Sequence, residues 1–397
     1  MGSESSPGRS PGPVLQSTEL ADLVRPCPGL TPELIPRLVR PFRIIAFDWD
    51  GTAVASRKED ASPVRDIVER LLRAGVFVVV ITGTNFQNID RQLTAHLCGP
   101  AKMNLFVAAN RGSEVFGFDV YGRPVVCWRR VATPEEDRLL TQIADALRDE
   151  LRARTGLEIG VIYDRLNRRK VDLIPLPEWA DPPKSALGEL LRAVEARLKG
   201  GGLAGGLAEA MELARKIASA KGLADARITS DAKHIEIGLT DKSDSMRWVA
   251  YELARPRGIS PTEILVGGDE FGPVGGLEGS DFRMLIPELA DAPTVSVGPE
   301  PGGVPAPVIH LGGGPACFRA LLRAIAECWE GLYPEQLGLA AVPLTDPAWS
   351  LTQEGYEPTR ERAYEALFAV ANGYAGVRAS LPEGTAHSAP ATYLAGV

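Results

Sequence analysis

Short apolar runs divide the chain, and each is followed directly by polar or glycine residues. The runs cover residues 44–47, 75–81, 105–110 and 264–268, and the stretch between the first two has room for one amphipathic helix near Ser62–Ala74. Short runs that are apolar on both faces are typical of the buried strands of a parallel sheet. Strands that alternate with helices predict an α/β fold with a Rossmann-like, doubly wound parallel sheet.

The segment between Thr82 and Lys242 is far longer than one strand–helix crossover needs. Its pattern predicts helices and strands of an inserted α+β domain, at residues 134–155, 158–164, 168–175, 184–198, 207–221, 226–230 and 234–239. The sequence therefore predicts the following parts: a disordered tail with short helical turns (1–40), a core (41–120 and 235–335), an insert (121–234) and a separate C-terminal segment (341–397).

Two carboxylates one residue apart end the first apolar run. Asp48 and Asp50 are separated by Trp49 and are followed by Gly51, which permits a sharp turn. Alternate residues of a strand point to the same side, so the two carboxylates face one way if the strand continues that far. Like charges that close repel each other unless a cation or a shared proton intervenes. The pair therefore indicates a divalent metal, or chemistry with one nucleophile and one acid/base.

Four motifs in this order resemble the signature of the haloacid dehalogenase superfamily. They are Asp48-x-Asp50-Gly-Thr, the strand that ends in Thr82-Gly83, Lys242 at a predicted helix start, and the strand that ends in Gly-Asp269. A strand that ends in Thr-Gly, or a lysine at a helix start, is common and means little by itself. All four in order, each on the expected element, give the resemblance.

The resemblance implies a role for each matching residue. Asp48 would be the nucleophile, Asp50 the acid/base, and Lys242 would neutralise both the nucleophile and the phosphate, while Thr82 and Gly83 would hold phosphoryl oxygens. The implied cofactor is Mg²⁺, bound by Asp48, by Asp50 through its carbonyl, and by Asp269. Glu270 and Asp281 would surround the metal without binding it directly. The Gly-rich loop between them is longer than the family's usual one and leaves these two roles open.

An insert at this position resembles the C2-type cap of sugar-phosphate phosphatases, trehalose-phosphate phosphatases and phosphomannomutases. Within it, Arg168, Arg169 and Lys170 stand at a strand–strand turn, where they either bind the substrate or form a solvated turn. The implied substrate is a phosphorylated sugar, with trehalose 6-phosphate as the first candidate. Two alternatives remain open: a phosphosugar mutase of the phosphomannomutase type, and a regulatory module fused to a disaccharide phosphorylase.

The last residues resemble a different family. The run Asn372-Gly-Tyr-x-Gly-x-Arg378 and the later Tyr393-x-x-Gly396 resemble the opening of the N-terminal sandwich of family 65 glycoside hydrolases, which include trehalose, maltose and kojibiose phosphorylases. We expect the chain to be a fragment of a longer fusion with a C-terminal glycoside hydrolase or phosphorylase module.

Composition agrees with an intracellular enzyme. The net charge is −8 with acids and bases interspersed, which argues against a nucleic-acid partner. The sequence has no apolar run of about 18–20 residues, so we expect no membrane span. The five cysteines are scattered without a Cys-x-x-Cys pair, which predicts reduced thiols and a cytoplasmic location.

Overall fold

The computed structural model describes most of the chain. The described residues are 25–180, 186–273, 276, 278–332, 358–360, 362–363, 365, 370–371, 375–378 and 391–394. Most of the predicted N-terminal tail, residues 1–24, lies outside them. Residue contacts divide the chain into one unit that ends at Pro343 and a second that begins at Leu344.

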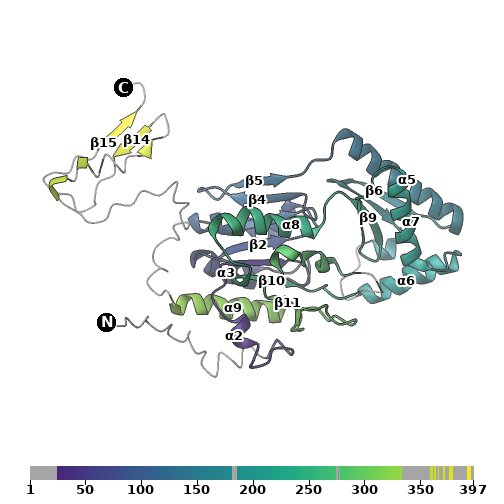
Figure 1. The fold of residues 1–397 in the computed structure, drawn as a ribbon, viewed down its shortest axis with the longest axis horizontal. Helices are drawn as coiled ribbons and strands as arrows, with labels where there is room; N and C mark the ends of the chain where they lie inside the picture. The colour runs from purple at the N-terminus through teal and green to yellow at the C-terminus, as the bar shows by residue number, and fades with distance from the viewer. Residues whose placement is uncertain are drawn as a thin grey trace, which may run out of the picture. The chain divides into compact units, whose positions relative to one another are not determined.

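An eight-stranded sheet forms the centre of the first unit (Figure 1). Its order is β12-β11-β10-β1-β2-β3-β4-β5, with parallel pairing from β12 to β3 and antiparallel pairing from β3 to β5. The strands are β1 (Ile44–Asp48), β2 (Phe77–Ile81), β3 (Leu105–Ala109), β4 (Glu114–Phe118), β5 (Pro124–Arg129), β10 (Ile264–Gly268), β11 (Thr294–Ser296) and β12 (Ile309–His310). The predicted fold class is confirmed.

Helices cover both faces of this sheet. The α-helices among the described residues of the first unit are α2 (Ile35–Leu38), α3 (Ser62–Arg73), α4 (Phe86–Gln92), α5 (Pro134–Thr155), α6 (Leu187–Gly200), α7 (Gly206–Ala220), α8 (Lys242–Trp248) and α9 (Gly314–Leu332), of which α5, α6 and α7 pack on a second sheet. Alternate residues of β1 face opposite sides: Ile45 and Phe47 pack in one apolar cluster with α3 and α9, whereas Ile44 and Ala46 pack in another with α8. Strands buried on both faces explain the near-continuous apolar runs.

A second, smaller sheet is antiparallel and has the order β6-β7-β9-β8. Its strands are β6 (Gly160–Arg165), β7 (Arg168–Asp172), β8 (Arg227–Ser230) and β9 (His234–Gly238), and it shares a third apolar cluster with α5, α6 and α7. The expected limits of the insert, 121 and 234, differ from these sheet boundaries. β5 pairs with β4 in the large sheet, and β9 pairs with β7 and β8 in the small one.

Short turns of other helix types complete the described elements. A π-helix (Val249–Ala254) continues α8, and 3-10 helices lie at Thr94–His96, Pro100–Asn104, Pro177–Trp179, Arg255–Arg257, Pro261–Glu263, Ser280–Met284, Pro287–Leu289 and Pro358–Arg360. In the second unit, an antiparallel sheet has the order β13 (Val370–Ala371), β14 (Ala375–Arg378) and β15 (Ala391–Leu394).

The cysteines depart from the expectation of five reduced thiols. Cys27 and Cys317 form a disulfide with their Cα atoms 4.8 Å apart, whereas Cys98, Cys127 and Cys328 are free thiols. The two paired residues are 290 positions apart in the sequence, so their spacing gave no signal. They meet because the segment before α2 packs on the start of α9, where both side chains are buried.

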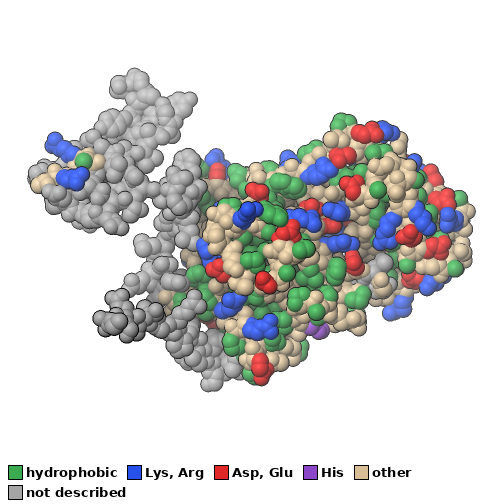
Figure 2. All heavy atoms as spheres, in the orientation of Figure 1, with side chains coloured by type: hydrophobic (Ala, Val, Ile, Leu, Met, Phe, Trp, Pro, Cys, Tyr) green, Lys and Arg blue, Asp and Glu red, His purple; other side chains and the backbone are tan. Residues whose placement is uncertain are grey.

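The visible surface carries intermingled charges. On the face drawn in Figure 2, basic and acidic side chains alternate over the described residues, which agrees with the interspersed charges of the sequence. Among the described residues, no helix combines the length and the apolar character that a membrane crossing needs.

We predict that a chain ending at residue 343 keeps the fold of the first unit. Its thermal midpoint should lie within about 2 °C of the corresponding transition of the full chain, a shift that corresponds to less than roughly 1 kcal/mol. The matched control ends at residue 312 and so removes α9, whose Phe318, Leu321 and Ile325 are fully buried. That control should not fold. Circular dichroism measures the thermal midpoint. A large fall in the midpoint of the chain that ends at residue 343 would show that the second unit stabilises the first.

Candidate functional site

The predicted motifs meet at one edge of the large sheet. β1 lies between β2 and β10 and runs parallel to both, so the carboxyl ends of the three strands lie side by side. Asp48 is the last residue of β1, Thr82 follows β2, and Asp269 follows β10. Ligands of open α/β sheets bind outside this edge, at the carboxyl ends of the strands.

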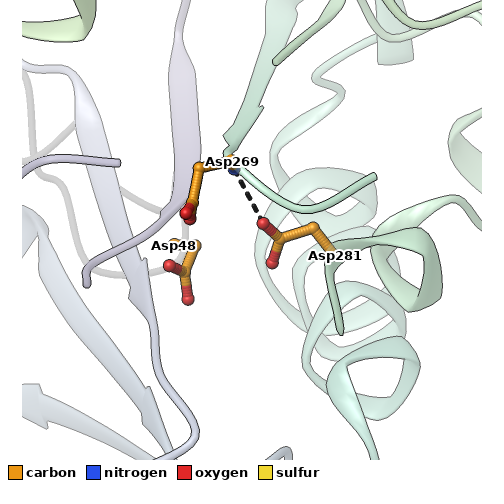
Figure 3. A group of neighbouring side chains, drawn as sticks. All are labelled: Asp48, Asp269 and Asp281. Carbon is orange, nitrogen blue, oxygen red and sulfur yellow. Dashed lines mark hydrogen bonds between the residues drawn. The ribbon is translucent and has the colours of Figure 1, made fainter. Parts of the chain in front are cut away.

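Three buried carboxylates gather there. Asp48, Asp269 and Asp281 each offer an oxygen atom within 4.8 Å of the others, and Figure 3 shows Asp48 and Asp269 approached by Asp281 from a neighbouring segment. The Asp281 carboxylate accepts hydrogen bonds from the backbone N–H groups of Asp269 (2.8 Å) and Glu270 (3.0 Å). A Cβ atom at Gly268 would lie 2.6 Å from Asp281 Oδ2, so glycine is what permits this approach.

Lys242 stands between two of these acids. Its Nζ atom donates a hydrogen bond to Asp48 Oδ1 at 2.7 Å and another to Asp281 Oδ1, and the side chain is almost fully buried. Burial lowers the pKa of Lys242, but Asp281 and Asp48 raise it by more, so the pKa lies above its ordinary value. Lys242, which only the order of the four motifs along the chain had indicated, is therefore a charged group inside the acidic cluster.

The helix start holds Lys242 in place. Asp241 caps α8, because its carboxylate accepts a hydrogen bond from the N–H group of Ser243 at 2.8 Å, and Asp244 accepts one from the N–H group of Asp241 at 2.9 Å. Such a reciprocal capping box satisfies helix N–H groups that would otherwise lack partners and fixes the first turn. The position of Lys242 thus follows from the local sequence Asp-Lys-Ser-Asp.

The other predicted residues lie around this cluster. Asp50 follows the strand, and its carboxylate lies 3.8 Å from Arg57 Nε, outside the group of three carboxylates. Thr82 is buried at the end of β2 and lies 3.2 Å from Thr84, oxygen to oxygen. The structure also brings in Thr52, which the sequence reading did not assign: its hydroxyl donates to Asp269 Oδ1 at 3.0 Å.

The donor set fits a hard divalent cation. Asp48, Asp269 and Asp281 supply only oxygen atoms, which is the chemistry that Mg²⁺ prefers. Lys242 contacts two of these three carboxylates, Asp48 and Asp281. The sequence reading had assigned the metal to Asp48, Asp50 and Asp269. The carboxylate that the structure adds is Asp281, because the loop after Asp269 turns back to the strand end.

The basic run of the insert is buried in ion pairs. Arg169 binds Asp137 at 2.7 Å, while Arg168 and Lys170, on the other face of β7, bind Glu236 at 3.2 and 2.6 Å. Arg168 also donates to the carbonyl oxygen of Gly83 at 3.2 Å, which joins the small sheet to the loop after β2. A solvated turn does not describe this arrangement, because Arg168 and Arg169 are buried, and binding of substrate by these side chains stays a prediction.

Glu236 is the centre of that ion pairing. The carboxylate is 1% exposed and also binds Arg111 of the core, whose Nε atom is 2.8 Å from Glu236 Oε2. Burial raises the pKa of Glu236, but the charges of Arg111, Arg168 and Lys170 together lower it to about 2. Sequence reasoning missed Arg111 and Glu236. The available signal for Glu236 was one acid among the apolar residues of β9.

A cavity of 260 Å³ lies between the large and the small sheet, beside Lys242. Its lining consists of charged side chains, three hydroxyl-bearing residues and a few small or apolar residues: Arg111, Met211, Arg215, Ile228, Thr229, Ser230, Asp241, Lys242, Gly276, Glu278, Gly279, Ser280 and Arg283. The cavity is therefore polar, and it is continuous with the position of the buried lysine.

Comparison with known sequences identifies the C-terminal segment. Residues 351–397 match the family model of the N-terminal domain of glycosyl hydrolase family 65, which confirms the resemblance of this segment. The chain is 51% identical over 59 residues to an uncharacterized glycosyl hydrolase of Mycobacterium tuberculosis, found in strains H37Rv and CDC 1551. That alignment covers 14% of this chain and 4% of the relative, so the chain matches only a small part of the relative's length.

The chain is also similar to solved structures. An N-terminally truncated IMP-nucleotidase of Plasmodium falciparum is 13% identical, with 77% of this chain and 73% of that chain covered and a TM-score of 0.46. A trehalose-6-phosphate phosphatase related protein is 16% identical, with 72% and 97% covered and a TM-score of 0.37.

We predict that Glu236→Gln destabilises the protein by about 3–5 kcal/mol at neutral pH, because it leaves buried basic groups without their carboxylate. The pKa of Glu236 is lowered from 4.5 to about 2 on folding, so its contribution is fully present above pH 4.5 and is lost as the pH falls toward 2. Urea unfolding at several pH values measures this. The difference between wild type and variant should shrink across that window; a constant difference would contradict the pKa shift.

Proposed function

We propose that this chain is a Mg²⁺-dependent phosphomonoester hydrolase that acts on a phosphorylated sugar through an aspartyl-phosphate intermediate. One observation carries the proposal: Lys242 lies in hydrogen-bond contact with Asp48, inside a buried group of three carboxylates at the carboxyl edge of a parallel sheet. A solvated helix start or a simple acidic turn would not bury an ammonium group between two acids.

The residues divide the reaction into two displacement steps. In the first, an Asp48 carboxylate oxygen forms a bond to phosphorus while the bond from phosphorus to the sugar oxygen breaks, and Asp50 gives its proton to the leaving alkoxide. In the second, Asp50 takes a proton from water and the water oxygen bonds to phosphorus, while the bond from phosphorus to the Asp48 oxygen breaks, which frees the Asp48 carboxylate and inorganic phosphate. Lys242, Thr82 and the N–H group of Gly83 hold the phosphoryl oxygens.

The metal belongs to the same site. Asp48, Asp269 and Asp281 are the side chains that would hold it, together with the carbonyl group of Asp50. When bound, it supplies positive charge that offsets the repulsion between the carboxylates and the phosphoryl group. Thr52 keeps the Asp269 carboxylate in position through its 3.0 Å hydrogen bond.

The sugar is the less direct part of the proposal. The family 65 match at residues 351–397 and the hydroxyl-bearing cavity support a sugar leaving group, and trehalose 6-phosphate is our first candidate. Fusion of this chain to a glycoside hydrolase module and a cytoplasmic location belong to the same proposal. Incubation with a panel of sugar phosphates separates the alternatives. A phosphatase releases free phosphate, a mutase moves it within the sugar, and a regulatory module does neither.

We predict that Asp48→Asn lowers turnover by at least about 10³-fold while the protein stays folded, because the variant lacks the attacking carboxylate. Phosphate release with Mg²⁺ measures the turnover, and the thermal midpoint reports folding. The matched control is Asp66→Asn, at an exposed position of α3, and it should retain wild-type turnover. More than about a tenth of wild-type turnover in Asp48→Asn would exclude Asp48 as the nucleophile.

We also predict that chelation abolishes activity and that added Mg²⁺ restores it, since the clustered carboxylates repel a phosphoryl dianion when no cation is bound. Phosphate release after treatment with a chelator, and again after Mg²⁺ is supplied, tests this. A chelator already saturated with Mg²⁺ is the control and should have no effect. Full activity in protein whose metal content is verified as nil would rule out the metal requirement.

A further inference from the structure

A left-handed turn follows β3, the strand next to the predicted phosphate-binding loop. Asn110 and Arg111 have φ angles of 53° and 51°, and Gly112 has 81°. Residues with side chains rarely adopt this backbone conformation, and where they do, the surrounding structure holds them there, often at functional sites. Here the N–H groups of Asn110 and Arg111 donate to the carbonyl oxygens of Thr84 (2.7 Å) and Thr82 (3.2 Å).

The same turn is pressed against the start of α8. A Cβ atom at Gly112 would lie 2.1 Å from the carbonyl oxygen of Asp241, the residue before Lys242. The turn is thus fixed from two sides, by the loop after β2 and by the cap of α8. The side chain of Arg111 extends from this turn and lines the same cavity as Lys242.

Arg111 reaches from the large sheet to the small one. Its Nε atom lies 2.8 Å from Glu236 of β9, and its Nη1 atom lies 3.4 Å from the hydroxyl oxygen of Thr229 in β8. The side chain is only 14% exposed. Glu236 binds Arg168 as well, so the carboxylate fixes two guanidinium groups at the junction of the sheets.

The cavity of 260 Å³ places Arg111 and Lys242 on one ligand-sized space. Lys242 bonds to the proposed nucleophile, Asp48, and lines this space. Arg111, which contacts residues of the small sheet, lines it together with Thr229 and Ser230. Its side chain also lies beside the predicted phosphate-binding loop, since a Cβ atom at Gly83 would lie 3.6 Å from Arg111 Nε. A guanidinium group beside hydroxyl groups recognises oxygen-rich groups through directed hydrogen bonds.

We propose that Arg111 is a specificity-determining residue that binds the oxygen-rich leaving group of the phosphomonoester substrate, and that Glu236 is a positioning residue that aims it. The inference rests on the proposed function and deepens it, because it names the part of the site that selects the substrate.

The test compares two substrates in full-length protein with Mg²⁺. One is the best substrate among trehalose 6-phosphate, glucose 6-phosphate and mannose 6-phosphate. The other is phenyl phosphate, whose esterified phenyl ring carries no hydroxyl group and no charge. Arg111→Met should lower kcat/KM for the sugar phosphate by roughly 10–100-fold. The factor by which it lowers kcat/KM for phenyl phosphate should be at least about five times smaller. Arg111→Lys, which keeps the charge, should lie between wild type and Arg111→Met.

Glu236→Gln should change the ratio of the two substrates in the same direction, mainly through a higher KM for the sugar phosphate. The matched control is Arg148→Met, which removes an arginine of α5 that pairs with Asp145 and Asp149 away from the cavity. Its substrate ratio should equal that of wild type. The proposal would be overturned if kcat/KM fell by the same factor on both substrates in both Arg111 variants, or if it fell on neither.

A binding measurement keeps the inference separate from catalysis. Titration calorimetry with the same three sugar phosphates uses Asp48→Asn as the non-reacting background and adds Arg111→Met or Arg111→Lys. The expected result is that the Arg111→Met change weakens binding by roughly tenfold or more. Equal affinity with and without Arg111, or no binding of any of the three, would overturn the role of Arg111. If binding in the Asp48→Asn background depends on Arg111 but the wild-type protein releases no phosphate, the proposed function alone would be overturned.

Discussion

The arrangement of the candidate site depends on one buried lysine. Three carboxylates meet at the carboxyl edge of the large sheet, and their mutual repulsion would drive them apart in a medium of low dielectric constant. Lys242 binds Asp48 and Asp281 at once, and Asp281 in turn accepts the amide hydrogens of Asp269 and Glu270. The ammonium group thereby connects β1, α8 and the loop after β10. Because α8 is capped by Asp241, the lysine is held from its own backbone as well.

A second buried charge, Glu236, connects the two sheets. Buried ion pairs give little net stability, because removing charges from water costs about as much as their attraction returns. Their effect is on geometry. A buried charge without its partner is so unfavourable that the two side chains of the pair are held in one relative orientation. Arg111 of the core and Arg168 of the small sheet share this carboxylate, and Arg168 also binds the Gly83 carbonyl. The loop expected to hold phosphate and the sheet that lines the cavity are therefore joined through side chains.

Much of this was accessible from the sequence, for identifiable reasons. Strands buried on both faces leave continuous apolar runs, so β1, β2, β3 and β10 could be located, and the parallel order brings their polar ends together. Asp48, Thr82, Lys242 and Asp269 follow from that geometry and from the family resemblance. The limits of the small sheet were less accessible, because β5 and β9 join sheets through pairing partners that no local pattern identifies. The Cys27–Cys317 pair was missed for the same reason.

The sequence by itself determined which residues stand at strand ends, because hydrophobic period and strand length are local properties of the chain. It also determined the capping of α8, the helix that begins at Lys242, since a capping box consists of four consecutive residues. Only the tertiary structure decided that Asp281 joins Asp48 and Asp269, that Arg168 and Arg169 are buried rather than solvated, and that Arg111 meets Glu236. Those outcomes depend on which distant segments share one low-dielectric space, where a charge must find an opposite charge whatever its separation along the sequence.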